Sequence, residues 1–146
     1  MRAVLQRVSS ARVSVGDEIT GSIGPGLLVL LGIHKADTAS AGEWLAKKIL
    51  QVRIFEDESG KMNRSVLDCR GELLIVSQFT LYGDVSKGTR PSFSESMPGE
   101  QARPFYSEWV TRLRQSCPLK IEEGRFGAMM SVALVNAGPV TIILDS

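Results

Sequence analysis

Two short segments of this sequence carry side chains that could act on a substrate. Ser77-Gln78-Phe79-Thr80 places two hydroxyls and an amide at the end of a very apolar run, and strand ends often carry sites in sheet proteins. Such groups can position a substrate, but they do not by themselves make a strong base. The second segment, residues 136–141, contains a Gly-Pro bond that the sequence permits to be cis. The ordinary alternatives are a strand emerging into solvent and a tight turn.

Few other residues offer a nucleophile or a metal ligand. His34 is the only histidine, and Cys69 and Cys117 lie far apart without a CxxC spacing, so we expect no metal site and no cofactor. A serine hydrolase would have to use His34, which we interpret as a loop residue after an apolar strand. Neither cysteine has a base beside it in the sequence, which indicates unreactive thiols. The stretch Gly21–Gly26 precedes a strand, whereas phosphate-binding loops follow one, so we interpret it as a turn.

Composition narrows the class of protein. The 146 residues are about one domain's worth, and 43% hydrophobic with 23% charged residues is typical of a globular chain. A net charge of +1 argues against broad binding to duplex DNA but allows a local basic patch. The longest apolar run, Gly26–Ile33, is too short to cross a membrane, and the first residues do not resemble a signal peptide. We therefore expect a cytoplasmic protein that has no membrane partner.

The elements that position these residues follow from hydrophobic periodicity. Alternation predicts two strands, over Met1–Val8 and at residues 11–15, with turns at Gly16-Asp17 and Gly21–Gly26. Gly26–Ile33 reads as a central strand that is apolar on both faces. Helical spacing predicts a helix over residues 41–52, capped by Thr38 or Ser40.

The second half of the chain continues the pattern. Further strands are predicted at Val52–Phe55, after which Glu56–Arg64 is a polar loop, and then at Gly71–Leu81, Leu119–Glu122, Ala128–Val135 and Val140–Asp145. Tyr82–Gly99 reads as a long loop of the functional kind, and a second helix with an apolar stripe over residues 102–113 follows it. Short turns between strands and only two long helices predict one α/β domain, residues 1–146, with a mixed sheet that is not doubly wound.

The ordered set of segments resembles the D-aminoacyl-tRNA deacylase family over nearly the whole chain. The likeness rests on SQFTL at 77–81 and NAGPVT at 136–141, with further matches at residues 6–8, 60–63, 90–93 and 124–126 and at Met130. Ala137 stands where many members carry an acidic residue, and Met129 where they carry a polar one. Neither side chain is expected to make an essential contact.

The resemblance implies a compact, barrel-like fold of largely antiparallel sheet with two covering helices, and a homodimer with active sites at the subunit interface. It implies hydrolysis of the ester between a D-amino acid, or mischarged glycine, and the 3′-terminal adenosine of tRNA. Gly138-Pro139 would be cis and would enter the partner's pocket, where its carbonyls receive the substrate's ammonium group and reject the L form. The carbonyl of Phe126 would assist, Met130 would belong to the same substrate-binding set, and Arg7 would brace the Gly-Pro loop.

By the same resemblance, Ser77, Gln78, Phe79 and Thr80 line the ester side, and backbone N–H groups near Phe79 and Thr80 stabilise the oxyanion. Water that is placed by backbone groups, with help from the adenosine 2′-hydroxyl, would then suffice for an ester. Two alternatives remain open from the residues alone. One is a different esterase that uses Thr80 or Ser77 covalently, and the other is a noncatalytic RNA-binding module.

Overall fold

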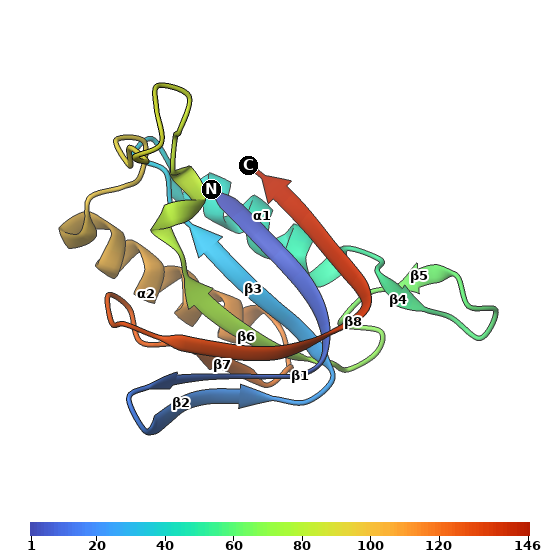
Figure 1. Ribbon diagram of the computed structural model, residues 1–146. Coiled ribbons are helices and arrows are strands. Elements are labelled where there is room, and N and C mark those ends of the chain that lie inside the picture. The colour runs from blue at the N-terminus through green and yellow to red at the C-terminus, as the bar shows by residue number, and fades with distance from the viewer.

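The apolar runs of the sequence form one six-stranded sheet (Figure 1). The computed structural model describes all of residues 1–146. Its strand order is β2-β1-β3-β6-β7, and β8 pairs with the other edge of β1. The β1 pairings are antiparallel, whereas β3, β6 and β7 run parallel. The strands are β1 (Arg2–Val15), β2 (Glu18–Ile23), β3 (Gly26–Gly32), β6 (Glu72–Ser77), β7 (Ile121–Glu123) and β8 (Ser131–Asp145).

Strand β1 is one continuous element, so the prediction of two separate strands was wrong. Its first half pairs with β3, its second half pairs with β2, and β8 follows it along nearly its whole length. The register against β8 shifts between Gln6 and Val8 and again between Val8 and Ser10. Such irregularities bend a strand without ending it, which explains why the broken alternation was interpreted as a gap.

Strand β8 likewise runs straight through the segment predicted to be a turn. Asn136–Pro139 is an irregular part of one continuous strand rather than a turn between two strands, because β1 pairs with β8 on both sides of it. A second correction concerns Gly21–Gly26, of which residues 21–23 belong to β2. The turn at Gly16-Asp17 is confirmed.

Two long helices cover one face of the sheet, as predicted. Helix α1 (Ala39–Gln51) begins after Thr38, whose hydroxyl accepts a hydrogen bond from the Ala41 N–H at 3.4 Å. Helix α2 (Gly99–Ser116) buries an apolar stripe that includes Tyr106 and Trp109. Their polar atoms are satisfied, since the Tyr106 hydroxyl donates to the Ile75 carbonyl and the Trp109 indole to the Gly42 carbonyl.

The short elements differ most from the prediction. The strand predicted at Val52–Phe55 is present only as β4 (Phe55–Glu56), which forms a small hairpin with β5 (Met62–Arg64) inside the predicted loop. The strand predicted to reach Leu81 ends at Ser77, and a 3₁₀ turn, η1 (Phe79–Tyr82), follows.

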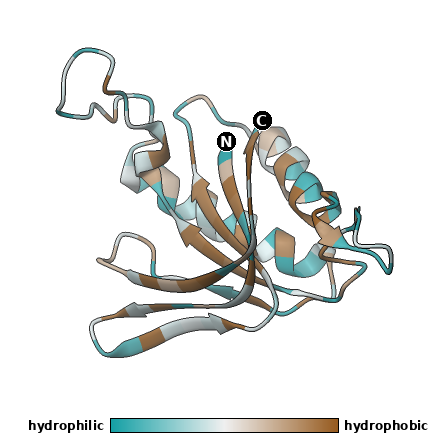
Figure 2. Cartoon of the chain, turned by 45° about the vertical axis from the view of Figure 1, so that its right-hand side comes forward, coloured by the Kyte–Doolittle hydropathy of each residue, from teal (hydrophilic) through white to brown (hydrophobic).

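The core lies on both faces of the sheet, and the expected fold class is confirmed. A cluster of 20 buried residues fills the space between the helices and the sheet, and a smaller cluster of 7 lies inside the curled half formed by β1, β2, β3 and β6. Figure 2 shows the apolar residues concentrated on the strands, while the helices carry both kinds. Since β2 also approaches β7, the mixed sheet is nearly closed and barrel-like. No helix combines the length and apolarity needed to span a bilayer.

Candidate active site

The first predicted segment lies where β6 leaves the sheet. The Gln78 N–H donates to the Leu31 carbonyl at 2.7 Å, which fixes the point where the chain departs from the neighbouring strand β3. The 3₁₀ turn η1 begins at the next residue. Because the first N–H groups of a helical turn have no partner within it, those of Phe79 and Thr80 are left to other acceptors.

The side chains of this turn are held by specific contacts. The Gln78 amide donates to the Thr80 hydroxyl. The Phe79 ring is 58% exposed and meets the Phe93 ring edge-on, with 5.0 Å between centroids. The Ser96 hydroxyl donates to the Phe79 carbonyl at 2.8 Å. The long loop before α2 is therefore attached to η1 by an aromatic contact and by a hydrogen bond.

A cavity of about 870 Å³ opens beside this turn. It contains Ser77, Gln78 and Phe79 from the end of β6, together with Phe126 and Met130 from the segment before β8. Other walls come from the strand ends, the loop before α2 and the start of α2, and include Leu31, Val76, Phe93, Ser96, Met97, Ala102, Met129 and Val132. The structure thus brings five of the nine candidate residues into one cavity, whereas Thr80, the residue after Phe79, does not line it.

The remaining candidates gather elsewhere on the chain. Gly138 and Pro139 are exposed, and the peptide bond between them is cis. Neither residue lines the cavity. Arg7 is 12% exposed and donates to the Ala137 carbonyl at 3.1 Å and to the Ile54 carbonyl at 2.8 Å. Arg7 therefore anchors the Gly138-Pro139 segment of β8 to the body of the protein.

The cavity itself is uncharged. None of its lining residues carries an ionised side chain, and its polar side chains are Ser77, Gln78, Ser94 and Ser96. Burial raises the pKa of Tyr82, just beyond Thr80, to about 12. Burial likewise raises the pKa of Tyr106, which packs against Phe126. Both phenols are protonated at neutral pH, and so neither supplies a base to the cavity.

His34 does not reach the candidate hydroxyls. Its Nδ1 accepts from the Ala36 N–H at 3.1 Å, and its Nε2 lies 3.1 Å from the Glu95 carboxylate. Its ring packs against Tyr82, with 5.2 Å between centroids. The two ring nitrogens are thus occupied, and neither Thr80 nor Ser77 is within hydrogen-bond reach of an imidazole.

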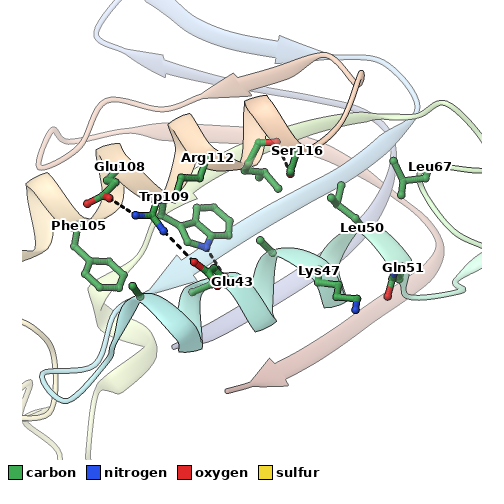
Figure 3. A pocket seen from close by; sticks show the side chains of 14 residues that line it. Glu43, Lys47, Leu50, Gln51, Leu67, Phe105, Glu108, Trp109, Arg112 and Ser116 are labelled. Atoms are coloured by element: carbon green, nitrogen blue, oxygen red, sulfur yellow. Dashed lines mark hydrogen bonds and ion pairs between the residues drawn. The ribbon is translucent and has the colours of Figure 1, made fainter.

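A second cavity of about 400 Å³ lies between the two helices and contains none of the predicted site residues. Figure 3 shows Trp109 and Leu50 in its walls, with Arg112 bridging Glu43 and Glu108 at its rim. The bonds measure 3.0 and 2.6 Å. These ion pairs link α1 to α2 and stabilise one turn of α2.

Sequence reasoning did not single out several residues that shape the main cavity. Phe93 belongs to a segment quoted only for the family likeness, and Ser96 and Ala102 were not proposed for the site. The one available signal was the long Gly-, Ser- and Pro-rich loop, which was predicted to be functional and supplies Phe93 and Ser96.

Comparison with known structures first shows which solved structures share this fold. A structure titled "c-Myc DNA Unwinding Element Binding Protein" superposes with a TM-score of 0.95 at 49% identity, covering 100% of this chain and 99% of its own. A "probable eukaryotic D-amino acid tRNA deacylase" superposes at 0.83, covering 99% and 98%. At 20% identity, this second likeness concerns the fold alone.

Comparison of sequences then gives the family. The model of the D-Tyr-tRNA(Tyr) deacylase family matches residues 4–145. Proteins named D-aminoacyl-tRNA deacylase from Thermosipho melanesiensis and Thermosipho africanus are 56% and 57% identical over 146 residues, covering all of this chain and 97% of theirs. The chain belongs to the D-Tyr-tRNA(Tyr) deacylase family, and the expected resemblance is confirmed.

Proposed function

We propose that this protein is a cytoplasmic D-aminoacyl-tRNA deacylase, which hydrolyses the ester between a D-amino acid, or mischarged glycine, and the 3′-terminal adenosine of tRNA. One observation carries the proposal: an uncharged cavity of about 870 Å³ joins Ser77, Gln78 and Phe79 to Phe126 and Met130. Its walls are mostly apolar with a few hydroxyls and one amide, as suits a nucleoside and a small acyl group. Family membership agrees with this substrate.

The chemistry proposed for the site relies on backbone groups. The N–H groups of Phe79 and Thr80 stabilise the negative charge that develops on the ester carbonyl oxygen when water attacks it. The adenosine 2′-hydroxyl passes the proton of the attacking water to the departing 3′ oxygen. An activated ester needs no stronger base, which agrees with a cavity that holds no ionisable side chain.

The proposed recognition of the amino acid uses Gly138 and Pro139 of a second subunit. Both residues are exposed and lie outside the cavity of their own chain, so another copy is needed to bring them to a substrate. Their backbone carbonyls accept the substrate's ammonium group, with the Phe126 carbonyl. The hydrogen bond from Arg7 to the Ala137 carbonyl supports this role by holding the segment in place.

Rejection of L-amino acids follows from these two contacts. Holding the ammonium group and the ester carbonyl fixes two substituents of the α-carbon, which leaves two directions for the hydrogen and the side chain. In the D form the side chain points outward, and in the L form it meets the Gly138-Pro139 backbone. Selectivity then comes from excluding the L enantiomer. Varied D side chains are tolerated, and glycine passes.

The test is a deacylation time course on D-tyrosyl-tRNA, L-tyrosyl-tRNA and glycyl-tRNA. The proposal expects release of D-tyrosine and of glycine, with L-tyrosyl-tRNA untouched even at high enzyme concentration. Comparable rates for the D and L esters would remove the proposed recognition. Binding of tRNA without release of any amino acid would replace the enzyme with an RNA-binding module.

A further inference from the structure

The cavity offers no positive charge to the phosphates of the proposed tRNA substrate. An aminoacyl-tRNA brings the phosphodiester groups of its 3′ end up to the mouth of the cavity, yet the lining has no charged side chain. Phosphate contacts supply much of the affinity of proteins for nucleic acids, and they come mainly from arginine and lysine. A cation that serves this role must therefore lie at the rim.

Arg103 occupies such a position. It follows Ala102, which lines the cavity, on helix α2, and its guanidinium stacks over the ring of Phe126, another lining residue, at 5.0 Å from the centroid. A guanidinium nitrogen of Arg103 also approaches Gly127, so closely that a Cβ there would lie 3.2 Å from it. Phe126 also packs against Tyr106, with 5.5 Å between ring centroids, and this contact helps to hold the ring on which Arg103 stacks.

Arg103 also lacks the partner that the other arginines of the same helix have. Arg112 pairs with Glu43 and Glu108, and Arg114 pairs with Glu123. Arg103 is exposed, has no carboxylate within 4.0 Å, and donates no hydrogen bond within the chain. Stacking uses the face of a guanidinium and leaves its N–H edge free, and that edge fits two phosphate oxygens.

The geometry points to Arg103 as a phosphate-binding residue at the rim of the cavity, where it holds a phosphodiester of the single-stranded 3′ end of the tRNA. This inference rests on the proposed function, because it concerns the same cavity and the same substrate. Phe126 then has two roles, as a wall of the cavity and as the platform that orients the arginine. Arg103 is assigned to binding and takes no part in bond cleavage.

The experiment compares two substrates that share the ester and differ in phosphate, D-tyrosyl-tRNA and D-tyrosyl-adenosine. Arg103→Gln should lower kcat/KM for D-tyrosyl-tRNA by about tenfold more than for D-tyrosyl-adenosine, because a charge-assisted contact is lost only with the tRNA. The loss should appear in KM. The slope of log affinity for the tRNA against log salt should become shallower by about 0.7, the value for one phosphate of a single strand.

Arg112→Gln is the matched control, because it removes the same charge from the same helix beside the other cavity. It should change neither the ratio of kcat/KM between the two substrates nor the salt slope of tRNA affinity. Arg103→Lys should recover part of the salt dependence. An equal loss on both substrates, or an unchanged salt slope in Arg103→Gln, would overturn the assignment. Failure of the wild-type protein to cleave either substrate would instead overturn the proposed function, so the two failures are distinguishable.

Discussion

At the scale of single residues, side chains hold backbone atoms of the proposed site in place. Ser96 holds the Phe79 carbonyl, and Arg7 holds the Ala137 carbonyl. Such partners are hidden from sequence reasoning because Arg7 and Ala137 are 130 positions apart and no local pattern links them. Only resemblance to a family suggested that Arg7 braces the Gly-Pro segment. Nothing in the sequence distinguished Arg103 from the other basic residues of its helix.

Thr80 provides a test at this scale. Its hydroxyl accepts from the Gln78 amide and has no imidazole within reach, so we predict that Thr80→Ala retains deacylation within about tenfold of wild type, the effect of one hydrogen bond. Loss of a covalent nucleophile would instead cost on the order of 10⁴- to 10⁶-fold. Single-turnover rates on D-tyrosyl-tRNA are the measurement. A folded variant that binds tRNA and shows only background hydrolysis would favour the covalent esterase.

At the scale of elements, the sequence predicted those helices and strands whose apolar residues follow a regular pattern. Both helices, β3 and the whole of β6 were found because their apolar residues recur at helical spacing or in unbroken runs. The continuity of β1 and β8 was missed, because Ser9-Ser10 and Gly138-Pro139 interrupt the alternation and only the paired strand shows that the chain continues. The 3₁₀ turn η1 was missed because an apolar strand runs directly into it.

The contact between β3 and β6 provides a test of an element. Gly26 pairs with Glu72, and a Cβ at residue 26 would collide with the Glu72 backbone, whereas one at Gly24 would meet nothing within 4 Å. We predict that Gly26→Ala lowers the free energy of unfolding by about 1–3 kcal/mol, a typical effect of overpacking. Gly24→Ala is the control and should be nearly neutral. Urea denaturation measures both, and equal stability of the two variants would contradict the close packing of β3 on β6.

At the scale of the whole molecule, the chain leaves one edge of its sheet open. β8 pairs only with β1, and its Val135 and Ile143 are 58% and 63% exposed. A long exposed edge with apolar side chains is a surface on which another chain can pair. The same strand carries Gly138 and Pro139, which lie outside the cavity of their own chain. The sequence suggested a dimer only through family resemblance, because an open edge becomes visible only when the sheet is assembled.

We therefore predict a twofold homodimer that uses β8, in which the same surface of each copy meets the other. A charge placed on this strand by Ile143→Lys should weaken the dimer and lower deacylation together, because a separated subunit has no second copy to supply Gly138 and Pro139. Ile19→Lys is the matched control, since Ile19 is 58% exposed, close to the 63% of Ile143, but lies on β2. Sedimentation velocity at micromolar concentration, combined with activity on D-tyrosyl-tRNA, measures both properties. A monomer with full activity would show that one chain holds the complete site, and the Gly138-Pro139 segment would then need a different role.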